Sequence, residues 1–444
     1  MARAKKEAAL TPEERLQAAL VPDWEWPYKL PENWCWTYQK AVCSLSTGEK
    51  RIGNDYPYWE VKCLRGITLP QIVSSGNFVP VFSKVILVDG ENSGEVFTIL
   101  TSGYMGSTFR MLQISAVVFP KYLELFILSN KDVYRNRKTG SAIPHLNKEL
   151  FFSTPFPLPP LAEQQRIVDR IESLFAKLDE AKEKAQAVVD SFETRKAAIL
   201  HKAFTGELTA KWREERGVGM ESWGKRRINE LARPRAGYAF DSKEFSNTGY
   251  QVVRIGNLYG ETLDLFRKPV FISEDDVDDS ILNRALIKDG DILITLTGTK
   301  YKRDYGYAVC VSSPNKLLVN QRILCLTPFA CVERNYLLYY LKSNLFRDVF
   351  FSCETGGVNQ GNVSSKFVEN IEIPIPTFDE QLEITTVLDR TLAHEQQAKE
   401  AAEAALDQID LMKKSILARA FRGELGTNDP SEESAVELLR NSIN

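Results

Sequence analysis

The chain has 444 residues, of which 43% are hydrophobic and 26% charged, and its formal net charge at pH 7 is −3. A chain of this length exceeds one ordinary hydrophobic core, so two or more domains of a soluble globular protein are expected. No apolar run is long enough to predict a membrane span, and the slightly negative balance means that any nucleic-acid contact depends on local basic clusters.

The N-terminal residues 1–23 predict a short helical segment. The string TPEE, Thr11 to Glu14, places threonine at the N-cap, proline at the first helical position and glutamate at the third, which is a capping box. The segment before it lacks the apolar stretch of a signal peptide. Seven cysteines without a CxxC pair indicate reduced, buried thiols in a cytoplasmic protein, and three scattered histidines predict no metal site.

A repeat divides the chain. The string PLPPLAEQQRI begins at Pro157, and PIPTFDEQLEI begins at Pro374, an offset of 217 residues. The offset holds without a gap over roughly fifty positions, which makes it a strong sign of duplication. Both copies end in Gly-Glu-Leu, at Gly206 and at Gly423.

Each copy predicts one long helix, over residues 157–208 and 374–425. Prolines and acidic residues suit the helix start, and a glycine suits the helix end. A heptad seam runs along each copy, and Thr391 and Glu395 make the second seam more polar. The seam residues are Ile167, Ile171, Leu174, Leu178, Ala181, Ala185, Val188, Phe192 and Ile199 in the first copy, and Ile384, Leu388, Ala398, Ala402, Ala405, Ile409 and Ile416 in the second. Neither helix could bury its seam alone, so we expect each to pack against the other.

Two segments of mixed pattern precede the helices, at residues 24–156 and 222–373, with a connector at 209–221 and a tail at 426–444. Short β-type runs with turn residues between them, and one helix-like stretch each, predict two α+β domains of related design. A weak echo joins them, because ENW ends at Trp34 and ESW at Trp223, an offset of 189 residues.

Basic and aromatic residues cluster in both segments. Lys131, Arg135, Arg137 and Lys138 follow a helix-like stretch, and GTKYKRDYGY carries Lys300, Lys302 and Arg303 among tyrosines. Such loops can contact phosphates and base edges. A solvated loop with salt bridges explains any one cluster as well, but two copies favour paired binding domains.

The chain resembles the specificity (S) subunits of type I restriction-modification systems. The helices carry the resemblance most specifically, in PLPPLAEQQRIVDRIESLFAKLDEAKEKA, RKAAILHKAFTGELT, IPIPTFDEQLEI and KKSILARAFRGEL. The strings VVRIGNL, GDILI and VNQRI resemble the target-recognition domains more loosely.

The resemblance implies an α+β fold in which two target-recognition domains are held apart by two long antiparallel helices in a pseudo-two-fold circular arrangement. Each domain would read one half of a bipartite site in double-stranded DNA, and the helices would set the gap. Two methyltransferase (M) subunits, and in the full complex two restriction (R) subunits, would be the partners. The chain itself would be non-catalytic and hold no cofactor, with S-adenosylmethionine, ATP and magnesium on the partners, and methylation falling on adenine N6.

Within this interpretation, loops are the expected sites of base contact. The candidate DNA-binding residues are Ser102, Tyr104, Lys131, Arg135, Arg137 and Lys138 in the first domain and Lys300, Tyr301, Lys302, Arg303, Asn320, Gln321 and Arg322 in the second. Arg254 and Asn257 of the RIGN string are further candidates that could equally hold the loop fold. Phe204 and Phe421, near the helix ends, are the candidate partner contacts.

Two other interpretations compete with this one. A self-sufficient DNA-modifying enzyme would need an Asn/Asp-Pro-Pro-Tyr/Phe motif and a cofactor loop, and neither is found; the near P-loop from Gly219 to Arg226 lacks Ser or Thr after Lys225. A coiled-coil scaffold that joins protein partners without base readout would leave DNA binding unchanged when Lys300, Lys302 or Arg303 is replaced.

Overall fold

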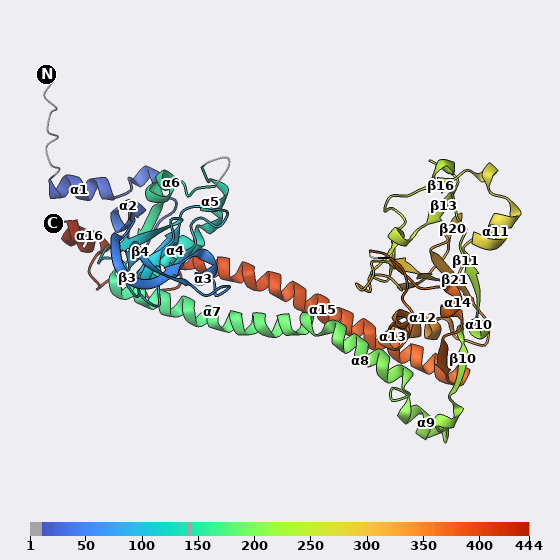
Figure 1. Cartoon of the computed structure of the whole chain (residues 1–444). Helices are drawn as coiled ribbons and strands as arrows, with labels where there is room; N and C mark the ends of the chain where they lie inside the picture. Colours follow the sequence, from blue (N-terminus) through green and yellow to red (C-terminus); the bar gives the residue numbers. More distant parts are fainter. Residues whose placement is uncertain (1–10, 140–143, 358, 444) are drawn as a thin grey trace. The chain divides into compact units, whose positions relative to one another are not determined.

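The computed structural model describes residues 11–139, 144–357 and 359–443 (Figure 1). Two compact units divide the chain: unit 1 comprises Met1–Ala185 with Ala404–Asn444, and unit 2 comprises Gln186–Glu403. Residues 1–10 of the expected N-terminal segment lie outside the described ranges. The rest of that segment forms α1 (Pro12–Ala19) and contains the predicted capping box at Thr11 and Glu14.

Unit 1 carries the first α+β domain. Its helices, apart from the long ones, are α1, η1 (Asp23–Glu25), α2 (Gln39–Val42), α3 (Val61–Leu64), α4 (Pro120–Ser129), α5 (Lys131–Asn136), α6 (Lys148–Ser153) and α16 (Ala435–Ile443). Its strands are β1 (Cys35–Tyr38), β2 (Cys43–Ser46), β3 (Glu49–Trp59), β4 (Gln71–Val79), β5 (Lys84–Leu87), β6 (Val96–Thr98), β7 (Gly103–Met105), β8 (Phe109–Ile114) and β9 (Pro155–Leu158). They form a sheet of order β2-β8-β5-β6, a small closed barrel of β3, β4 and β7, and the pair β1-β9.

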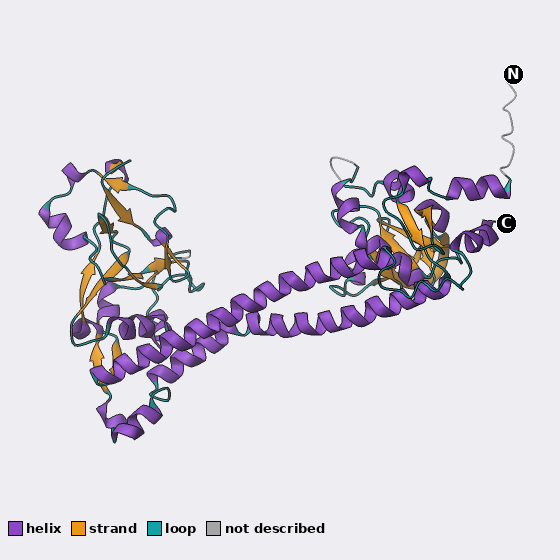
Figure 2. Cartoon of the chain, turned by 180° about the vertical axis from the view of Figure 1, so that it is seen from behind, coloured by secondary structure: helices purple, strands orange, loops and turns teal. Residues whose placement is uncertain are grey.

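Unit 2 carries the second α+β domain (Figure 2). Its helices are α9 (Ala210–Arg216), η2 (Met220–Ser222), α10 (Ile228–Leu231), η3 (Ser242–Glu244), η4 (Ile255–Asn257), η5 (Glu274–Asp276), α11 (Asp279–Ala285), α12 (Arg334–Lys342), α13 (Asn344–Ser352) and α14 (Ser365–Glu369). Its strands are β10 (Gly224–Arg227), β11 (Ala232–Ala236), β12 (Phe245–Ser246), β13 (Tyr250–Val253), β14 (Leu258–Tyr259), β15 (Thr262–Leu263), β16 (Phe271–Ile272), β17 (Ile292–Thr295), β18 (Thr297–Gly298), β19 (Ala308–Cys310), β20 (Leu317–Val319), β21 (Ile323–Pro328), β22 (Gly361–Asn362) and β23 (Glu372–Ile375). Two four-stranded sheets result, β11-β21-β17-β19 and β12-β16-β13-β20. The first sheet contributes alternate residues of β17 and β21 to two hydrophobic cores, and β13 and β20 of the second sheet belong to one of these two cores.

The two domains share their design, as the repeat predicts. The succession β1-α2-β2 of unit 1 recurs as β10-α10-β11 in unit 2 at the offset of 189 seen in the sequence. The antiparallel pair β1-β9 begins with Cys35 opposite Leu158, and the pair β10-β23 begins with Gly224 opposite Ile375, which is the same register. The conserved offsets therefore belong to the strand pair that closes each domain at the start of its long helix.

Paired long helices run through each unit. The helices are α7 (Leu161–Asp190), α8 (Phe192–Phe204) and α15 (Phe378–Phe421). In unit 1, Lys182 binds Asp410 at 2.8 Å, and Lys413 lies over the Phe175 ring, 4.9 Å from its centre. In unit 2, α8 and α15 meet through Arg195 and Glu395, 2.6 Å apart. Residue numbers rise along α7 where they fall along α15, so the two helices are antiparallel.

The first repeat is two helices rather than the single one predicted. The helix is divided at Ser191, whose hydroxyl donates to the Ala187 carbonyl, while the Arg195 guanidinium donates to the Val188 carbonyl at 3.2 Å. Side chains that bond to backbone carbonyls compete with the helical ladder and bend helices. The second repeat has Gln408 at the equivalent position and continues unbroken.

The predicted seam is partly wrong. Ile171, Ile384 and Leu388 are buried, but the alanines Ala181, Ala398 and Ala405 are exposed. A helix of 3.6 residues per turn drifts away from a strict seven-residue repeat, and two helices cover only a narrow stripe of each other. The polar position Glu395 is satisfied by Arg195 rather than by apolar packing.

The cysteines are all free thiols, as expected, but their expected burial holds only in part. Cys35, Cys43 and Cys325 are buried, whereas Cys331 and Cys353 are exposed, because both lie in surface turns beside helices of unit 2. Burial raises the pKa of the Cys35 and Cys43 thiols to about 12. Within the described ranges, every helix is too short or too polar to traverse a lipid bilayer.

Candidate nucleic-acid interface

Two repeated glutamines attach the long helices to the domains. Gln164 accepts a hydrogen bond from the Phe119 amide at 2.7 Å, at the start of α4, and Gln381 accepts one from the Glu333 amide at 2.8 Å, at the start of α12. Both are buried, and each also donates to the carbonyl of a repeated proline, Pro159 or Pro376, at 3.0 Å. Each domain is thus held at the start of its helix by the same contacts.

The prolines that open each repeat receive a matching bond from the domain. The Tyr122 hydroxyl donates to the Pro157 carbonyl at 3.0 Å, and the Tyr336 hydroxyl donates to the Pro374 carbonyl at 2.7 Å. Buried polar groups of this kind are costly when left without a partner. The repeated strings therefore encode the attachment of a domain to a helix.

A buried carboxylate, Glu163, lies in the first turn of α7. It accepts hydrogen bonds from the Asn428 amide at 3.0 Å, the Thr427 hydroxyl at 2.9 Å and the Arg166 Nε at 2.8 Å. Although burial opposes ionisation, these bonds hold the pKa of Glu163 below its usual value. A Cβ at Gly426 would lie 1.7 Å from the Glu163 carboxylate, so any side chain there would displace the carboxylate from this position. We call this set the Glu163 anchor.

The equivalent residue of the second repeat is Glu380, and it is also fully buried. It accepts from the Thr209 hydroxyl at 2.7 Å, the Arg213 guanidinium at 2.5 Å and the Trp223 indole at 3.0 Å. The Arg213 side chain is only 8% exposed. This set, the Glu380 anchor, joins the start of α15 to the segment that follows α8.

The predicted partner contacts, Phe204 and Phe421, are wrong as surface residues. They are 4% and 3% exposed. Phe204 packs on Tyr336 and Tyr340 of α12, and Phe421 packs on Tyr122 and Phe126 of α4, all at ring distances of 5.1–5.3 Å. Each aromatic ring instead fixes the end of one long helix to a domain core.

The candidates of the first domain are mostly held by the protein itself. Tyr104 is fully buried in the barrel, with its hydroxyl on the Asn54 carbonyl at 3.0 Å, which corrects its assignment as a base contact. The Ser102 hydroxyl accepts from the Val81 amide at 2.9 Å. Lys138 binds the Glu91 carboxylate at 3.1 Å.

Lys131, Arg135 and Arg137 lie on or beside α5. Lys131 and Arg137 are exposed, and Arg135 is half-buried with an Nε that has no partner in the described part of the chain. Lys131 and Arg135 line a hollow together with Glu95 and Glu124. Both carboxylates are already paired, Glu95 with Arg65 and Glu124 with Lys84 and Lys121, so the hollow keeps the positive charge of Lys131 and Arg135.

The candidates Lys300, Tyr301, Lys302 and Arg303 form one surface loop of unit 2. Tyr301 is 81% exposed, and both Tyr301 and Arg303 have left-handed backbone conformations, with φ of 66° and 51°. Lys302 is exposed, Lys300 donates to the Gly356 carbonyl at 3.0 Å, and Arg303 binds Asp348 at 2.9 Å.

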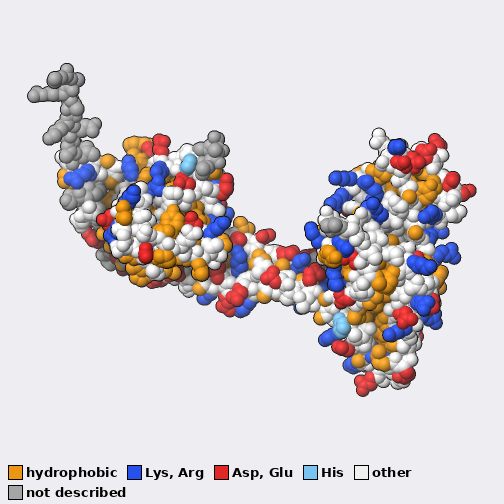
Figure 3. Space-filling view, in the orientation of Figure 1, with side chains coloured by type: hydrophobic (Ala, Val, Ile, Leu, Met, Phe, Trp, Pro, Cys, Tyr) orange, Lys and Arg blue, Asp and Glu red, His pale blue; other side chains and the backbone are white. Residues whose placement is uncertain are grey.

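A second basic surface of unit 2 surrounds a cavity. It is lined by Arg254, Ile255, Gly256, Asn257, Arg267, Lys268, Asn320, Gln321 and Arg322. The structure thus brings five predicted residues together, from the RIGN and VNQRI strings, with no carboxylate in the lining. Figure 3 shows Lys and Arg side chains gathered on the flank of unit 2 beside β13 and β16. We call this the basic cavity.

The five predicted residues of the cavity differ in role. Asn257 is 2% exposed, and its amide donates to the carbonyls of Asp264 and Arg267 at 2.9 and 3.0 Å, so it holds a loop. Arg254 donates to the Lys268 carbonyl at 2.7 Å. Gln321 and Arg322 are exposed, and Asn320 accepts from the Arg322 amide at 3.3 Å.

A line of alternating arginines and aromatic rings joins the cavity to the loop at 300–303. Arg267 lies 5.9 Å from the Tyr259 ring, which meets Tyr307 at 5.8 Å. Arg347 lies between Tyr307 and Phe351, at 5.3 and 5.2 Å, and Arg303 lies over Phe351 at 5.3 Å. Arg347 also donates to the carbonyls of Arg303, Tyr305 and Gly306, so its end of the line is held by the protein. Arg267 and the Tyr259 ring at the other end are exposed, and a cation beside a ring is suited to phosphates and base faces.

Arg267, Lys268 and the Tyr259 ring were missed from the sequence. They lie in the string YGETLDLFRKPVF, which lacks a glycine-bounded basic run like the one that made GTKYKRDYGY a candidate. The Arg-Lys pair before a proline was the available signal, but only the fold brings it beside the VNQRI string.

The comparison with known families agrees with this geometry. Residues 39–189 and 220–404 match the family described as Type I restriction modification DNA specificity domain. These two stretches span most of the chain, so it belongs to the family of type I restriction-modification specificity subunits, and it carries the DNA specificity domain twice.

Individual specificity subunits are also similar to this chain in sequence or in fold. The chain is 27% identical over 335 residues to the type I restriction enzyme EcoKI specificity subunit of Escherichia coli (strain K12). The aligned region covers 72% of this chain and 68% of that subunit. Among solved structures, it resembles the HsdS subunit from Thermoanaerobacter tengcongensis, with a TM-score of 0.61 and 20% identity over 90% of this chain and 99% of that one. A second solved structure, from a study of complex assembly and conformational transition of the type I R-M system, has a TM-score of 0.68 and 19% sequence identity. That match covers 90% of this chain and 100% of the other. These likenesses confirm the expected α+β fold class.

Proposed function

We propose that this chain reads DNA for a type I restriction-modification complex, with residues 24–156 and 222–373 each reading one half of a bipartite double-stranded site. The duplicated attachment carries this proposal. The same glutamine, proline and buried carboxylate recur in both units at one offset. Two equivalent attachments suit two half-sites, much as a dimer does.

The paired helices would set the unspecified gap between the half-sites. Their polar and apolar contacts fix the register of one helix against the other within each unit, through Lys182 with Asp410 and Arg195 with Glu395. A change in helix length would then change the gap and leave the half-sites unaltered.

The partners would be two M subunits and, in the full complex, two R subunits. Because Phe204 and Phe421 are buried, M subunits would dock on outward faces of the long helices. S-adenosylmethionine would be held by M, and ATP and magnesium by partner subunits, so that the assembled complex methylates adenine N6 and cleaves DNA. We place this complex in the cytoplasm, where bacterial DNA lies.

The basic cavity supports DNA readout over the scaffold alternative. Arg267, Lys268 and Arg322 are exposed and make no salt bridge within the described ranges. Unpaired cations beside an amide such as Gln321 suit phosphate contacts and base-edge contacts, respectively. A scaffold without base readout gives no reason to gather them.

Methylome sequencing tests the proposal. Cells carrying this chain and its M partner should show one bipartite methylated sequence. Exchange of residues 24–156 for the matching domain of another family member should change one half only, and one added heptad in each helix should lengthen the gap. Alteration of both halves by the single exchange would refute the modular reading, and an unchanged motif would refute DNA readout by that domain.

A further inference from the structure

The loop from Asp264 to Pro269 in unit 2 is held by hydrogen bonds from side chains of preceding residues. Asn257 binds the Asp264 and Arg267 carbonyls, Arg254 binds the Lys268 carbonyl, and the Gln251 amide donates to the Leu265 carbonyl at 2.6 Å. The first residue also closes the turn, because the Asp264 carboxylate accepts from the Phe266 amide at 3.0 Å. These bonds hold four of the six carbonyls of a short surface loop, which limits the entropy that the loop would lose on binding.

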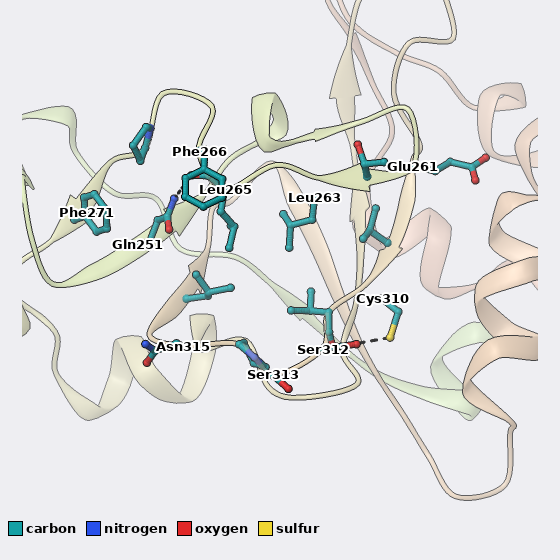
Figure 4. A pocket seen from close by; sticks show the side chains of 16 residues that line it. Gln251, Glu261, Leu263, Leu265, Phe266, Phe271, Cys310, Ser312, Ser313 and Asn315 are labelled. Atoms are coloured by element: carbon teal, nitrogen blue, oxygen red, sulfur yellow. Dashed lines mark hydrogen bonds between the residues drawn. The ribbon is translucent and has the colours of Figure 1, made fainter. Parts of the chain in front are cut away.

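Three consecutive side chains of this loop point outward, whereas Leu265 packs against a hydrophobic core. Phe266 is 93% exposed, and the next two residues, Arg267 and Lys268, are exposed as well. Figure 4 shows Phe266 beside Gln251 and Leu265, at the end of an apolar hollow that reaches Cys310. Phe266 is therefore not a lone exposed ring but part of a contiguous apolar surface with Leu263 and Leu265, and such surfaces mark interaction sites.

The two residues that follow Phe266 carry the charge that identifies the occupant. Arg267 and Lys268 line the basic cavity together with Arg322, and no Asp or Glu belongs to that lining, whereas the apolar hollow that Phe266 lines contains Glu261. An apolar ring bordered by unpaired cations matches DNA, whose phosphates flank apolar base faces and thymine methyl groups.

We propose that Phe266 makes an apolar contact with a base of the second half-site, with Arg267 and Lys268 on the adjoining phosphates. Gln251, Arg254 and Asn257 act as positioning residues that hold the loop. This inference rests on the proposed function, and it assigns the RIGN string to loop support rather than to base contact.

The main test uses the complex of this chain with its M subunits. The probes are a duplex carrying the sequence found by methylome sequencing and an unrelated duplex of equal length. Phe266→Ala should weaken binding to the specific duplex by roughly 5- to 150-fold and leave the unrelated duplex and the salt slope unchanged. Arg267→Gln and Lys268→Gln should weaken binding to both duplexes, and each should lower the salt slope by about 1.

Two further arms identify the base feature. Replacing thymines of the second half-site with deoxyuridine removes their methyl groups, and loss of the Phe266 effect would assign the contact to one methyl. A rise in the fluorescence of 2-aminopurine at one step, absent with Phe266→Ala, would assign it to insertion between bases. If neither the deoxyuridine arm nor the 2-aminopurine arm gives a response, and Phe266→Ala binds the specific duplex as tightly as the wild type, the inference is overturned.

The positioning role needs its own readout. Asn257→Ala should weaken specific binding about as much as Phe266→Ala, and the double variant should lose little more, because both act through one contact. Additive losses would contradict positioning. Circular dichroism and thermal unfolding would show that each variant folds.

The controls separate the two proposals. Trp24→Ala removes another aromatic side chain, 84% exposed in unit 1, and should leave this half-site's binding unchanged. Loss of M-subunit assembly with Phe266→Ala would make the ring a protein contact and overturn the inference. If Arg267→Gln, Lys268→Gln and Arg322→Gln also leave both DNA affinity and the methylated sequence unchanged, the DNA-reading function of this domain fails with it.

Discussion

The Glu163 and Glu380 anchors hold equivalent places in the repeat, yet their partners differ. The Glu380 anchor is closed around Arg213, whose side chain is 8% exposed, and its partners follow α8 directly. The Glu163 anchor uses the tail after α15, and its arginine, Arg166, is 35% exposed and shared with Glu432 at 2.8 Å. The repeat thus preserves a buried acceptor at the helix start, while the groups that satisfy it are interchangeable.

The largest effect is expected at the closed anchor. Glu380→Ala leaves Arg213 buried without a carboxylate and removes the acceptor of the Thr209 hydroxyl and the Trp223 indole. Breaking a buried pair on one side costs about 3–5 kcal/mol of unfolding free energy. Urea unfolding of the wild type and the variant measures it. The exposed neighbour Asp379 provides the control, since Asp379→Asn should cost less than about 1 kcal/mol.

A smaller loss is expected at the other anchor. Glu163→Ala frees Arg166 to solvent and to Glu432, so the uncompensated groups are chiefly the Asn428 amide and the Thr427 hydroxyl. Such losses amount to about 1–3 kcal/mol. The same urea experiment ranks the two variants, and an equal or larger loss at Glu163 would show that exposure of the arginine does not decide the cost.

The Glu163 anchor should also respond to acid. The pKa of Glu163 is lower in the folded chain than in the unfolded one, so its contribution is complete above about pH 4.3 and is lost as the pH falls through the folded value. Glu163→Gln should therefore flatten the fall in stability below about pH 4.3. Unfolding curves from pH 3 to pH 6 check this, and a slope identical to that of the wild type would contradict it.

The smallest effect is expected along the helices of unit 2. Arg195 and Glu395 are 32% and 24% exposed, so solvent screens their attraction. A double-mutant cycle with Arg195→Ala and Glu395→Ala should give a coupling of about 0.5–1 kcal/mol. A coupling comparable to the loss at Glu380 would mean that the polar seam, and not the anchor, stabilises this unit.

Much of the fold could be predicted from the sequence because duplication leaves a direct record. The offset between Pro157 and Pro374 marks the helix starts, and the weaker one between Trp34 and Trp223 marks the paired strands that close each domain. Burial was harder to predict. The heptad pattern placed Ala398 in a seam that the drift of a straight helix leaves open to solvent.

The site could be predicted only in part, since tertiary contacts decide which side chains are free. Tyr104 and Phe421 have the residue type of a contact but lie in hydrophobic cores. Arg322 was found through its string, whereas Arg267 needed the fold, which brings two loops that are far apart in sequence around one cavity.

The uneven exposure of the thiols has a practical consequence. Maleimide dyes at neutral pH should react first with Cys331 and Cys353, both in unit 2, while burial and a pKa of about 12 keep Cys35 and Cys43 of unit 1 unreactive. The two exposed thiols therefore give a fluorescent handle on unit 2. Replacing the half-buried Cys63 of unit 1 would leave that unit free for a second, engineered label that reports distances in solution.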